Sequence, residues 1–393
     1  MRVGVGIDVA KETHWVAAVT ETGETVLDRR LQNEPEDIAR LIEELQPLAG
    51  QCQIGVDVVG GIAALLTAML LDAGFAVVHV PGLAVNRARQ GTTGGERKSD
   101  PKDARVIADQ VRVRHDLRRL AVEDAVRVDL RLLVGRRREL VVDQTRRLSR
   151  LHDLLTSIHP GLERRLDLTT KGSLWLLTRY VTPAEIRTAG QQRLLRHLRR
   201  AERLPHVETL AATALAAAAA QPLALPGEAV AAGLCRELAQ EALAVWARLA
   251  TLDQQIGALL AHHPDAALIR SLPGMGATLT AEFLVEAGDL QRFASADALA
   301  AAAGLAPVLR QSGKVRCQRR ARRGDKRLKR VFYQSAFCSL RSPASRAFYA
   351  RKRREGKRHH QALLALARRR VNVLWAMLRD RTSYTYELST AAA

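Results

Sequence analysis

A chain of 393 residues, of which 47% are hydrophobic, has room for two or three domains with buried cores, which excludes a wholly disordered protein. The formal net charge of +20 indicates a polyanionic partner, and no stretch reaches the roughly 18 apolar residues that a membrane-spanning helix needs. We therefore expect nucleic acid rather than a membrane as the partner. Aromatic residues make up only 4% of the chain, so backbone phosphates rather than stacked bases should carry the binding.

The cysteines and the N-terminal residues predict a cytoplasmic protein. The four cysteines lie far apart and form no CxxC pair, which favours reduced thiols over a disulfide scaffold or a zinc site. The apolar stretch at residues 3–9 is interrupted by Asp8, so we expect no signal peptide there.

The first hundred residues predict a mixed α/β sheet with helices on both faces. Strand signals and helical periodicity alternate along this part of the chain, in the order β-β-β-α-β-α-β. The expected strands are residues 2–9, 14–19, 25–31, 53–59 and 76–80, and the expected helices are residues 35–48 and 61–73.

Two aspartates belong to buried strands of this sheet. Asp8 ends the first strand and shares a face with Gly4 and Gly6, whose small size predicts space for a metal ion or a phosphate. Asp57 lies in a second glycine-flanked strand. A buried carboxylate is costly unless it is paired or binds a metal, so two of them in one small domain indicate a shared cation.

Two more aspartates, Asp100 and Asp103, lie three residues apart in a helix expected over residues 100–114, with Ser99 or Asp100 as its cap and Pro101 as its first residue. They can be acids that complement the helix dipole, which alone would be the simpler interpretation. Together with Asp8 and Asp57, they instead predict a four-carboxylate site of hard oxygen ligands for Mg²⁺ or Mn²⁺. Such ions support phosphoryl transfer.

The middle of the chain is predicted to be helical. From residue 126 apolar side chains alternate at spacings of three and four, with Arg137 and Gln144 as polar interruptions, which is typical of a coiled-coil seam. The partner of this seam is either the same chain or a second subunit. Residues 209–232 are rich in alanine and predict a weak helix and a linker without chemistry, before helical periodicity resumes at residues 234–260.

A Pro-Gly turn opens the last domain. Residues 272–276, which include Gly274 and Gly276, separate helices expected at residues 266–271 and 278–286 and resemble a helix-hairpin-helix turn. In that interpretation the second helix offers its N-terminal amides to a DNA phosphate. The alternative is a turn without a ligand.

A basic segment follows, with a single acid, Asp325, among many cations. This density predicts phosphate binding rather than a solvated surface. Ser312, beside a glycine within the segment, is a candidate nucleophile, preferred to Tyr333 and Tyr349, although a Ser-Gly pair is also common in turns. The cations of the segment are Arg310, Lys314, Arg316, Arg319, Arg320, Arg322, Arg323, Lys326, Arg327, Lys329 and Arg330.

Taken in order, these motifs resemble those of the insertion sequence 110 family of transposases, over nearly the whole chain except residues 160–260. The motifs are Gly-Ile-Asp-Val-Ala-Lys at residues 6–11, Gly-Val-Asp at 55–57, Lys-Ser-Asp-Pro-Lys-Asp-Ala at 98–104, Pro-Gly-Met-Gly at 273–276, Gly-Leu-Ala-Pro at 304–307 and Ser-Gly at 312–313.

The resemblance implies a RuvC-like DEDD domain of the RNase H fold at residues 1–115, a helical and coiled-coil region at residues 116–262, and a mainly α transposase domain at residues 263–393. It implies that four aspartates hold Mg²⁺, that Ser312 forms a covalent link to DNA, and that the protein acts as a dimer or tetramer on element ends and target DNA with a structured guide RNA. The second acid of the family is usually Glu, whereas this chain has Asp57. The four aspartates are Asp8, Asp57, Asp100 and Asp103.

Three other functions are weighed against this one. A RuvC-like junction nuclease would use water as the nucleophile and Ser312 as a structural residue. A sugar-kinase-like or actin-like ATPase can also begin with Gly-Ile-Asp, but the sequence lacks further glycine-rich phosphate loops. A non-catalytic nucleic-acid-binding protein would keep the basic segment and would not need four placed acids.

Overall fold

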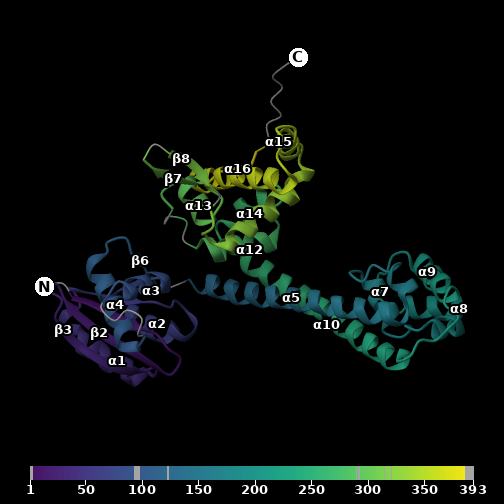
Figure 1. Cartoon of the computed structure of the whole chain (residues 1–393), viewed down its shortest axis with the longest axis horizontal. Coiled ribbons are helices and arrows are strands. Elements are labelled where there is room, and N and C mark those ends of the chain that lie inside the picture. Colours follow the sequence, from purple (N-terminus) through teal and green to yellow (C-terminus); the bar gives the residue numbers. More distant parts are fainter. Residues whose placement is uncertain are drawn as a thin grey trace, which may run out of the picture. The chain divides into compact units, whose positions relative to one another are not determined.

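A computed structural model describes residues 3–92, 98–121, 124–288, 290, 293–313, 315–319 and 321–385. The chain divides after Asp124 into two compact parts, which we call the N-terminal unit and the C-terminal unit (Figure 1). Each unit has hydrophobic cores of its own. In the described residues, no helix combines the length and the apolar character needed to cross a membrane.

The N-terminal unit is built on a mixed sheet with the strand order β3-β2-β1-β4-β5-β6. The first three strands are antiparallel neighbours, β1, β4 and β5 run parallel, and β6 returns antiparallel to β5. This is the mixed sheet expected of an RNase H-like fold. The predicted strands and helices all form, but the strand expected at residues 53–59 ends at Val56, so Asp57 follows it, and α3 and β6 were not predicted. The elements are β1 (Val3–Asp8), β2 (Thr13–Thr20), β3 (Thr25–Gln32), α1 (Pro35–Leu45), η1 (Gln46–Leu48), β4 (Cys52–Val56), η2 (Gly61–Ala63), α2 (Ala64–Asp72), β5 (Ala76–His79), α3 (Gly82–Gln90), α4 (Asp100–Val113) and β6 (Arg118–Arg119).

The two faces of β1 bury different kinds of residue. Val3, Val5 and Ile7 point to the face covered by α1 and α2, and they belong to one core with the buried leucines of these helices. The opposite face carries Gly4 and Gly6 and is covered by α4, which also packs on β2 and β4. The alternation of valine and glycine therefore selects a different helix for each face.

Two long helices, α5 (Ala125–Ile158) and α10 (Glu228–Ala261), pack along each other in the C-terminal unit (Figure 1). The two polar interruptions of the predicted seam find partners on α10. Gln144 is buried and donates a hydrogen bond to the carbonyl oxygen of Ala242, and Arg137 forms an ion pair with Asp253. The predicted seam on α5 therefore packs against α10 of the same chain.

Two separate cores surround the ends of this helix pair. One joins the C-terminal half of α5 to the N-terminal half of α10 and to α6–α9, and the other joins the opposite halves to the last helices of the chain. The elements of the unit besides α5 and α10 are α6 (Pro160–Glu163), α7 (Lys171–Leu177), α8 (Pro183–Leu198), α9 (Val207–Ala219), α11 (Ala266–Ser271), α12 (Ala277–Ala287), α13 (Ala296–Ala302), β7 (Val308–Ser312), β8 (Val315–Arg319), α14 (Lys326–Cys338), η4 (Ser339–Arg341), α15 (Pro343–Arg354) and α16 (His359–Asp380).

The alanine-rich segment differs from its prediction as a weak helix. It forms the 13-residue helix α9, in which Ala211, Ala214, Ala217 and Ala218 are fully buried. Small side chains let neighbouring helices approach closely, so these alanines act as core residues. The expected linker is shorter than predicted, because α10 begins at Glu228.

Candidate metal centre and nucleic-acid interface

Asp8 and Asp57 lie at the same edge of the sheet. Asp8 is the last residue of β1, and Asp57 directly follows β4. These strands are parallel neighbours, with Ile7 paired to Val56, so their carboxyl ends lie side by side. The backbone amide of Val9 donates a hydrogen bond of 3.2 Å to Oδ1 of Asp57, which fixes the second carboxylate beside the end of β1.

Glycines bring α4 to this edge. A Cβ atom at Gly6 would lie 2.1 Å from the carbonyl oxygen of Ala104 and 2.3 Å from the amide nitrogen of Ala108. The backbone of α4 therefore rests directly on β1, and the first turn of α4 carries Asp100, which is exposed, and Asp103, which is buried. The prediction that the glycines leave space for a metal or phosphate was wrong, because a helix fills that space.

The four aspartates form one electrostatically coupled cluster. Burial and the negative charges of Asp57, Asp103 and Asp100 raise the pKa of Asp8 to about 7, while Lys98 acts in the opposite direction. Burial also raises the pKa of Asp57, against the hydrogen bond from the Val9 amide, and the charge of Asp103 adds to the rise. The neighbouring cations of the protein therefore do not fully neutralise the negative charge of these carboxylates.

Sequence reasoning missed an arginine that contacts this cluster. Arg89, in the last turn of α3, places Nη1 at 2.8 Å and 2.7 Å from the two carboxylate oxygens of Asp103. Both side chains are largely buried, with 12% and 5% of their surface exposed. No sequence motif joins the end of one helix to the start of the next, so only the tertiary structure reveals this pair.

The cluster matches a hard divalent cation in its chemistry. All four side chains offer carboxylate oxygens, and a cation would relieve their mutual repulsion. Within the described ranges, however, no three acidic, histidine or cysteine side chains converge closely enough to hold one ion. The four-aspartate metal site therefore stays a prediction.

The Pro-Gly turn of the C-terminal unit is packed against the protein itself. Gly274 has a φ of +84°, and a Cβ atom there would lie 2.6 Å from the carbonyl oxygen of Ser335 in α14. The buried Arg370 of α16 donates hydrogen bonds to the carbonyl oxygen of Pro273 and to Oγ of Ser335. Internal packing thus explains the glycine at residue 274, whereas Gly276 is exposed at the start of α12. DNA binding by these glycines stays a prediction.

The basic segment begins with an exposed β-hairpin that was not predicted. Strands β7 and β8 pair antiparallel, and the pairing ends at Ser312 and Val315. Ser312 therefore lies at the tip of the hairpin with its side chain exposed to solvent. The two-residue connection that starts with Gly313 was a sequence signal for a hairpin. Lys314 and Arg320 lie outside the described residues.

Tyr333 and Tyr349, the alternative candidate nucleophiles, are less exposed than Ser312. Tyr349 in α15 has its hydroxyl 2.7 Å from Nδ1 of His359 at the start of α16. Tyr333 lies on α14 and is partly buried. In the described part of the chain, Ser312 is thus the most exposed of the three candidate nucleophiles.

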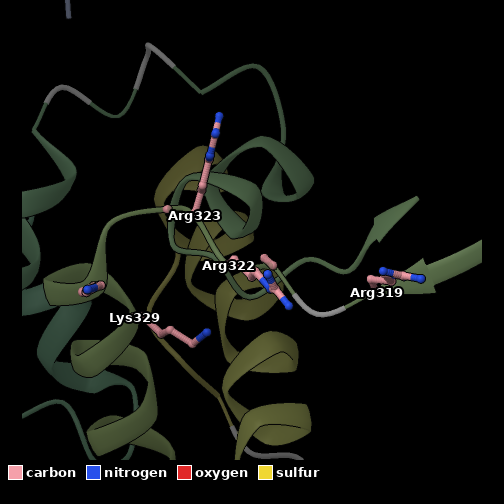
Figure 2. A pocket seen from close by; sticks show the side chains of 7 residues that line it. Arg319, Arg322, Arg323 and Lys329 are labelled. Atoms are coloured by element: carbon pink, nitrogen blue, oxygen red, sulfur yellow. The ribbon is translucent and has the colours of Figure 1, made fainter. Parts of the chain in front are cut away.

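A cationic hollow of about 720 Å³ is lined by the end of β8, the loop that follows it and the first turns of α14 (Figure 2). Figure 2 shows Arg319 at the end of β8, Arg322 and Arg323 in the following loop, and Lys329 on α14. The single acid of the segment, Asp325, is occupied in capping α14, since its Oδ1 accepts hydrogen bonds from two backbone amides. The residues that line the hollow are Arg319, Ala321, Arg322, Arg323, Gly324, Lys326 and Lys329.

The cations of the segment fall into two groups. Arg327 and Arg330 face Glu286 and Glu282 of α12, so part of their charge is compensated. In the described ranges, the remaining predicted DNA ligands form no ion pair with a carboxylate and are free to meet phosphates. These are Arg310, Arg316, Arg319, Arg322, Arg323 and Lys326.

Comparison with known proteins gives matches in both units. Residues 5–160 match a family model described as a transposase of the DEDD type, and residues 266–350 match one described as a transposase of the IS116/IS110/IS902 family. Part of the chain is also similar to RuvC from Thermus thermophilus in complex with a Holliday junction substrate. That likeness has 17% identity and a TM-score of 0.25, and it covers 30% of this chain and 100% of the other.

Similar proteins of insertion elements span the full length of the chain. A 42 kDa protein of the element IS900 from Mycobacterium paratuberculosis is 43% identical, with 100% of this chain and 99% of the relative covered. A 44.8 kDa protein of IS116 from Streptomyces clavuligerus is 43% identical over 98% of this chain and 96% of the relative. This chain belongs to the IS110 family of transposases, enzymes that cut and rejoin DNA.

Proposed function

We propose that this transposase cuts and rejoins DNA with a divalent metal, Mg²⁺ or Mn²⁺, held by Asp8, Asp57, Asp100 and Asp103, and with Ser312 as the nucleophile. The observation that carries the proposal is the gathering of the four aspartates at the paired ends of β1 and β4 and the first turn of α4, where burial and the neighbouring negative charges raise the pKa of Asp8 to about 7. Bringing four carboxylates together from two strand ends and one helix costs free energy, because the carboxylates repel one another. A bound divalent cation would relieve this repulsion and could support phosphoryl transfer.

In the proposed cutting step, Oγ of Ser312 loses its proton and attacks the phosphorus of a DNA phosphodiester. A serine oxygen–phosphorus bond forms, and a bond between phosphorus and a deoxyribose oxygen breaks. The leaving oxygen takes up a proton and becomes a hydroxyl. In the rejoining step a DNA hydroxyl attacks the phosphoserine and releases Ser312, so the number of phosphodiester bonds is conserved. The exposed position of Ser312 at the hairpin tip supports this role.

When bound, the metal would supply positive charge that stabilises the phosphoryl group during transfer. The carboxylates would hold it through oxygen atoms, as Mg²⁺ prefers. Asp57 has one methylene fewer than the glutamate usual in the family, so its contact with the ion would rely on the close approach of the two strand ends at Val9.

The basic hairpin and the loop after it would bind the DNA backbone. Support comes from the absence of carboxylate partners for most of these cations in the described ranges and from the hollow between β8 and α14. Membership in a transposase family supports DNA as the substrate, and we propose element ends and target DNA for this role. A structured guide RNA and a dimer or tetramer complete the proposal. We also propose the three domains expected from the sequence, with boundaries near residues 115 and 262. The proposed DNA ligands are Gly274, Gly276, Arg310, Lys314, Arg316, Arg319, Arg320, Arg322, Arg323, Lys326 and Arg327.

A covalent-trapping assay tests this function. The full chain is incubated with Mg²⁺, end DNA of its element and the flanking RNA, and denaturing electrophoresis detects protein joined to DNA. We expect an adduct with the parent and none with Ser312→Ala or Asp103→Ala. Ser149→Ala is the matched control, because Ser149 is an exposed serine of the same unit that lies on α5, outside the hairpin, and this variant should form the adduct normally.

The competing function is metal-dependent junction cleavage by water. It predicts nicked DNA without an adduct, and nicking that Ser312→Ala leaves intact. DNA binding with neither product would instead favour a non-catalytic nucleic-acid-binding protein.

A further inference from the structure

We propose that Arg89 is a built-in counter-ion that holds Asp103 away from the metal position and must be displaced before the four aspartates can bind a divalent cation. The inference rests on the proposed function, because it assumes that the cluster binds a metal. It adds a residue that the family motifs do not include.

The contact between Arg89 and Asp103 is specific. Nη1 of Arg89 lies 2.8 Å and 2.7 Å from the two carboxylate oxygens, so a single nitrogen engages both potential metal-binding atoms. Nη2 donates a hydrogen bond of 2.7 Å to Oδ1 of Asn86, one turn earlier in α3. The pair is largely buried, which makes the attraction stronger than that of a surface ion pair.

Arg89 itself is incompletely satisfied in this position. Its Nε is buried and has no hydrogen-bond partner in the described part of the chain. A buried unpaired donor costs free energy that release of the guanidinium towards water would recover. The arrangement is therefore suited to exchange rather than to a permanent structural link.

The charge of Arg89 relieves only one member of the cluster. Among the described contacts, the side chain of Arg89 donates hydrogen bonds to Asp103 and Asn86, and to none of the other three aspartates. A divalent ion placed among the carboxylates would relieve the repulsion at all of them. With Arg89 bound to Asp103, no three ligand side chains converge in the described residues. Because Arg89 engages both carboxylate oxygens of Asp103, release of this contact would free them for an ion.

Arg89 could instead position Asp103 for metal binding, and the two roles predict opposite effects of removing Arg89 on metal affinity. If Arg89 orients Asp103 for the metal, its removal should weaken metal binding, as loss of an outer-shell partner generally does. If Arg89 competes with the metal, its removal should strengthen binding. The sign of the change therefore separates the two roles.

Isothermal titration calorimetry of the full chain with MgCl₂ and with MnCl₂, without nucleic acid, measures this sign. We expect Arg89→Gln to tighten binding about tenfold, which corresponds to ~1.4 kcal/mol. Arg87→Gln is the matched control, because it removes the same charge from an exposed position on α3, and its effect should stay within about twofold. Binding by Arg89→Gln that is weaker than the parent, or equal to Arg87→Gln, would overturn the proposal.

Thermal unfolding gives a second readout. Arg89→Gln leaves the buried Asp103 carboxylate unpaired, so the metal-free Tm should fall, while the rise in Tm on adding Mg²⁺ should exceed that of the parent. If Arg89→Gln does not fold, Arg89→Lys is tested in its place. This variant keeps the positive charge but lacks the planar guanidinium that engages both oxygens of Asp103, so it should bind Mg²⁺ more tightly than the parent. Parent-like affinity of Arg89→Lys would then count against the proposal.

The same titrations separate this inference from the proposed function. Asp8→Asn should abolish the binding isotherm of the parent if the cluster holds the metal. If the parent binds no metal, or if Asp8→Asn binds as the parent does, the metal centre itself is wrong. If Asp8→Asn abolishes binding but Arg89→Gln leaves it unchanged, only the role of Arg89 is wrong.

Discussion

Replacing Asp8 with asparagine tests whether the carboxylate cluster destabilises the metal-free fold. The folded chain raises the pKa of Asp8 from 3.8 to about 7, through burial and the charges of its neighbours. The folded state therefore binds this proton more tightly than the unfolded state does. The stability that protonation confers is fully present below about pH 4 and is lost as the pH rises through 7.

The size of the effect follows from the pKa difference. Each pKa unit corresponds to ~1.4 kcal/mol, so a difference of about three units sets an upper limit of ~4 kcal/mol. Asp8 is partly exposed, and solvent screening reduces the expected value to about 2–3 kcal/mol. Asp8→Asn lacks the charge, so it should be more stable than the parent by this amount at pH 8 and equal to it at pH 4.

Amide hydrogen exchange of the metal-free full-length chain measures this difference locally. Peptides from β1 and β4 of Asp8→Asn should be protected more strongly than those of the parent at pH 8, with no gain near pH 4. Asp109→Asn serves as the control, because Asp109 is a half-exposed residue of α4 paired with Arg112. Equal protection of Asp8→Asn and parent at pH 8, or the same gain at both pH values, would refute the destabilising effect of the ionised Asp8 carboxylate.

Three further outcomes are expected. Gly6→Ala should lower the free energy of unfolding by about 1–3 kcal/mol in urea denaturation, since its Cβ meets the α4 backbone at 2.1 Å, whereas the exposed Gly50→Ala should be nearly neutral. Arg370→Met should cost about 1–3 kcal/mol in the same assay by leaving buried acceptors unpaired. Arg322→Gln should weaken DNA binding and reduce the salt slope, measured by fluorescence anisotropy, by about one; an unchanged slope contradicts a phosphate contact.

The strands and the positions of the aspartates could be predicted because they depend on local patterns. Alternation of apolar and small residues identifies β1, and a short, mostly apolar segment that includes Ile54 and Val56 identifies β4. Parallel pairing of such strands brings their carboxyl ends together, so the proximity of Asp8 and Asp57 follows from topology. The cap and Pro101 likewise predicted the start of α4.

Features that depend on tertiary packing could not be predicted in this way. A glycine face indicates a close approach without identifying what approaches, and at Gly6 it is a helix rather than a ligand. Arg89 meets Asp103 only because α3 and α4 pack together. The partner of the predicted seam was equally undetermined, because a heptad pattern is the same whether α10 or a second subunit covers it.

The hairpin is a different case, since its signal was present but unused. Apolar and polar residues alternate along most of β8, after the short connection at Gly313, and this is the period of two expected for a strand. The arginines of β8 also predict phosphate binding, so the same residues carry both a charge signal and the strand period. The hairpin bears on the proposed function because it makes Ser312 the terminal residue of a strand, at the tip of the hairpin.

The path of α4 links the stability of the N-terminal unit to its chemistry. Gly4 and Gly6 let the helix rest on β1, and the buried side chains of Ile107 and Val111 hold it there. The same approach forces the first turn of α4 towards Asp8, where like charges repel. Hydrophobic packing along the helix must therefore offset repulsion at its start, and a cation at the cluster would remove that opposition. We infer that metal binding should protect the first turn of α4 from hydrogen exchange more than its last turn.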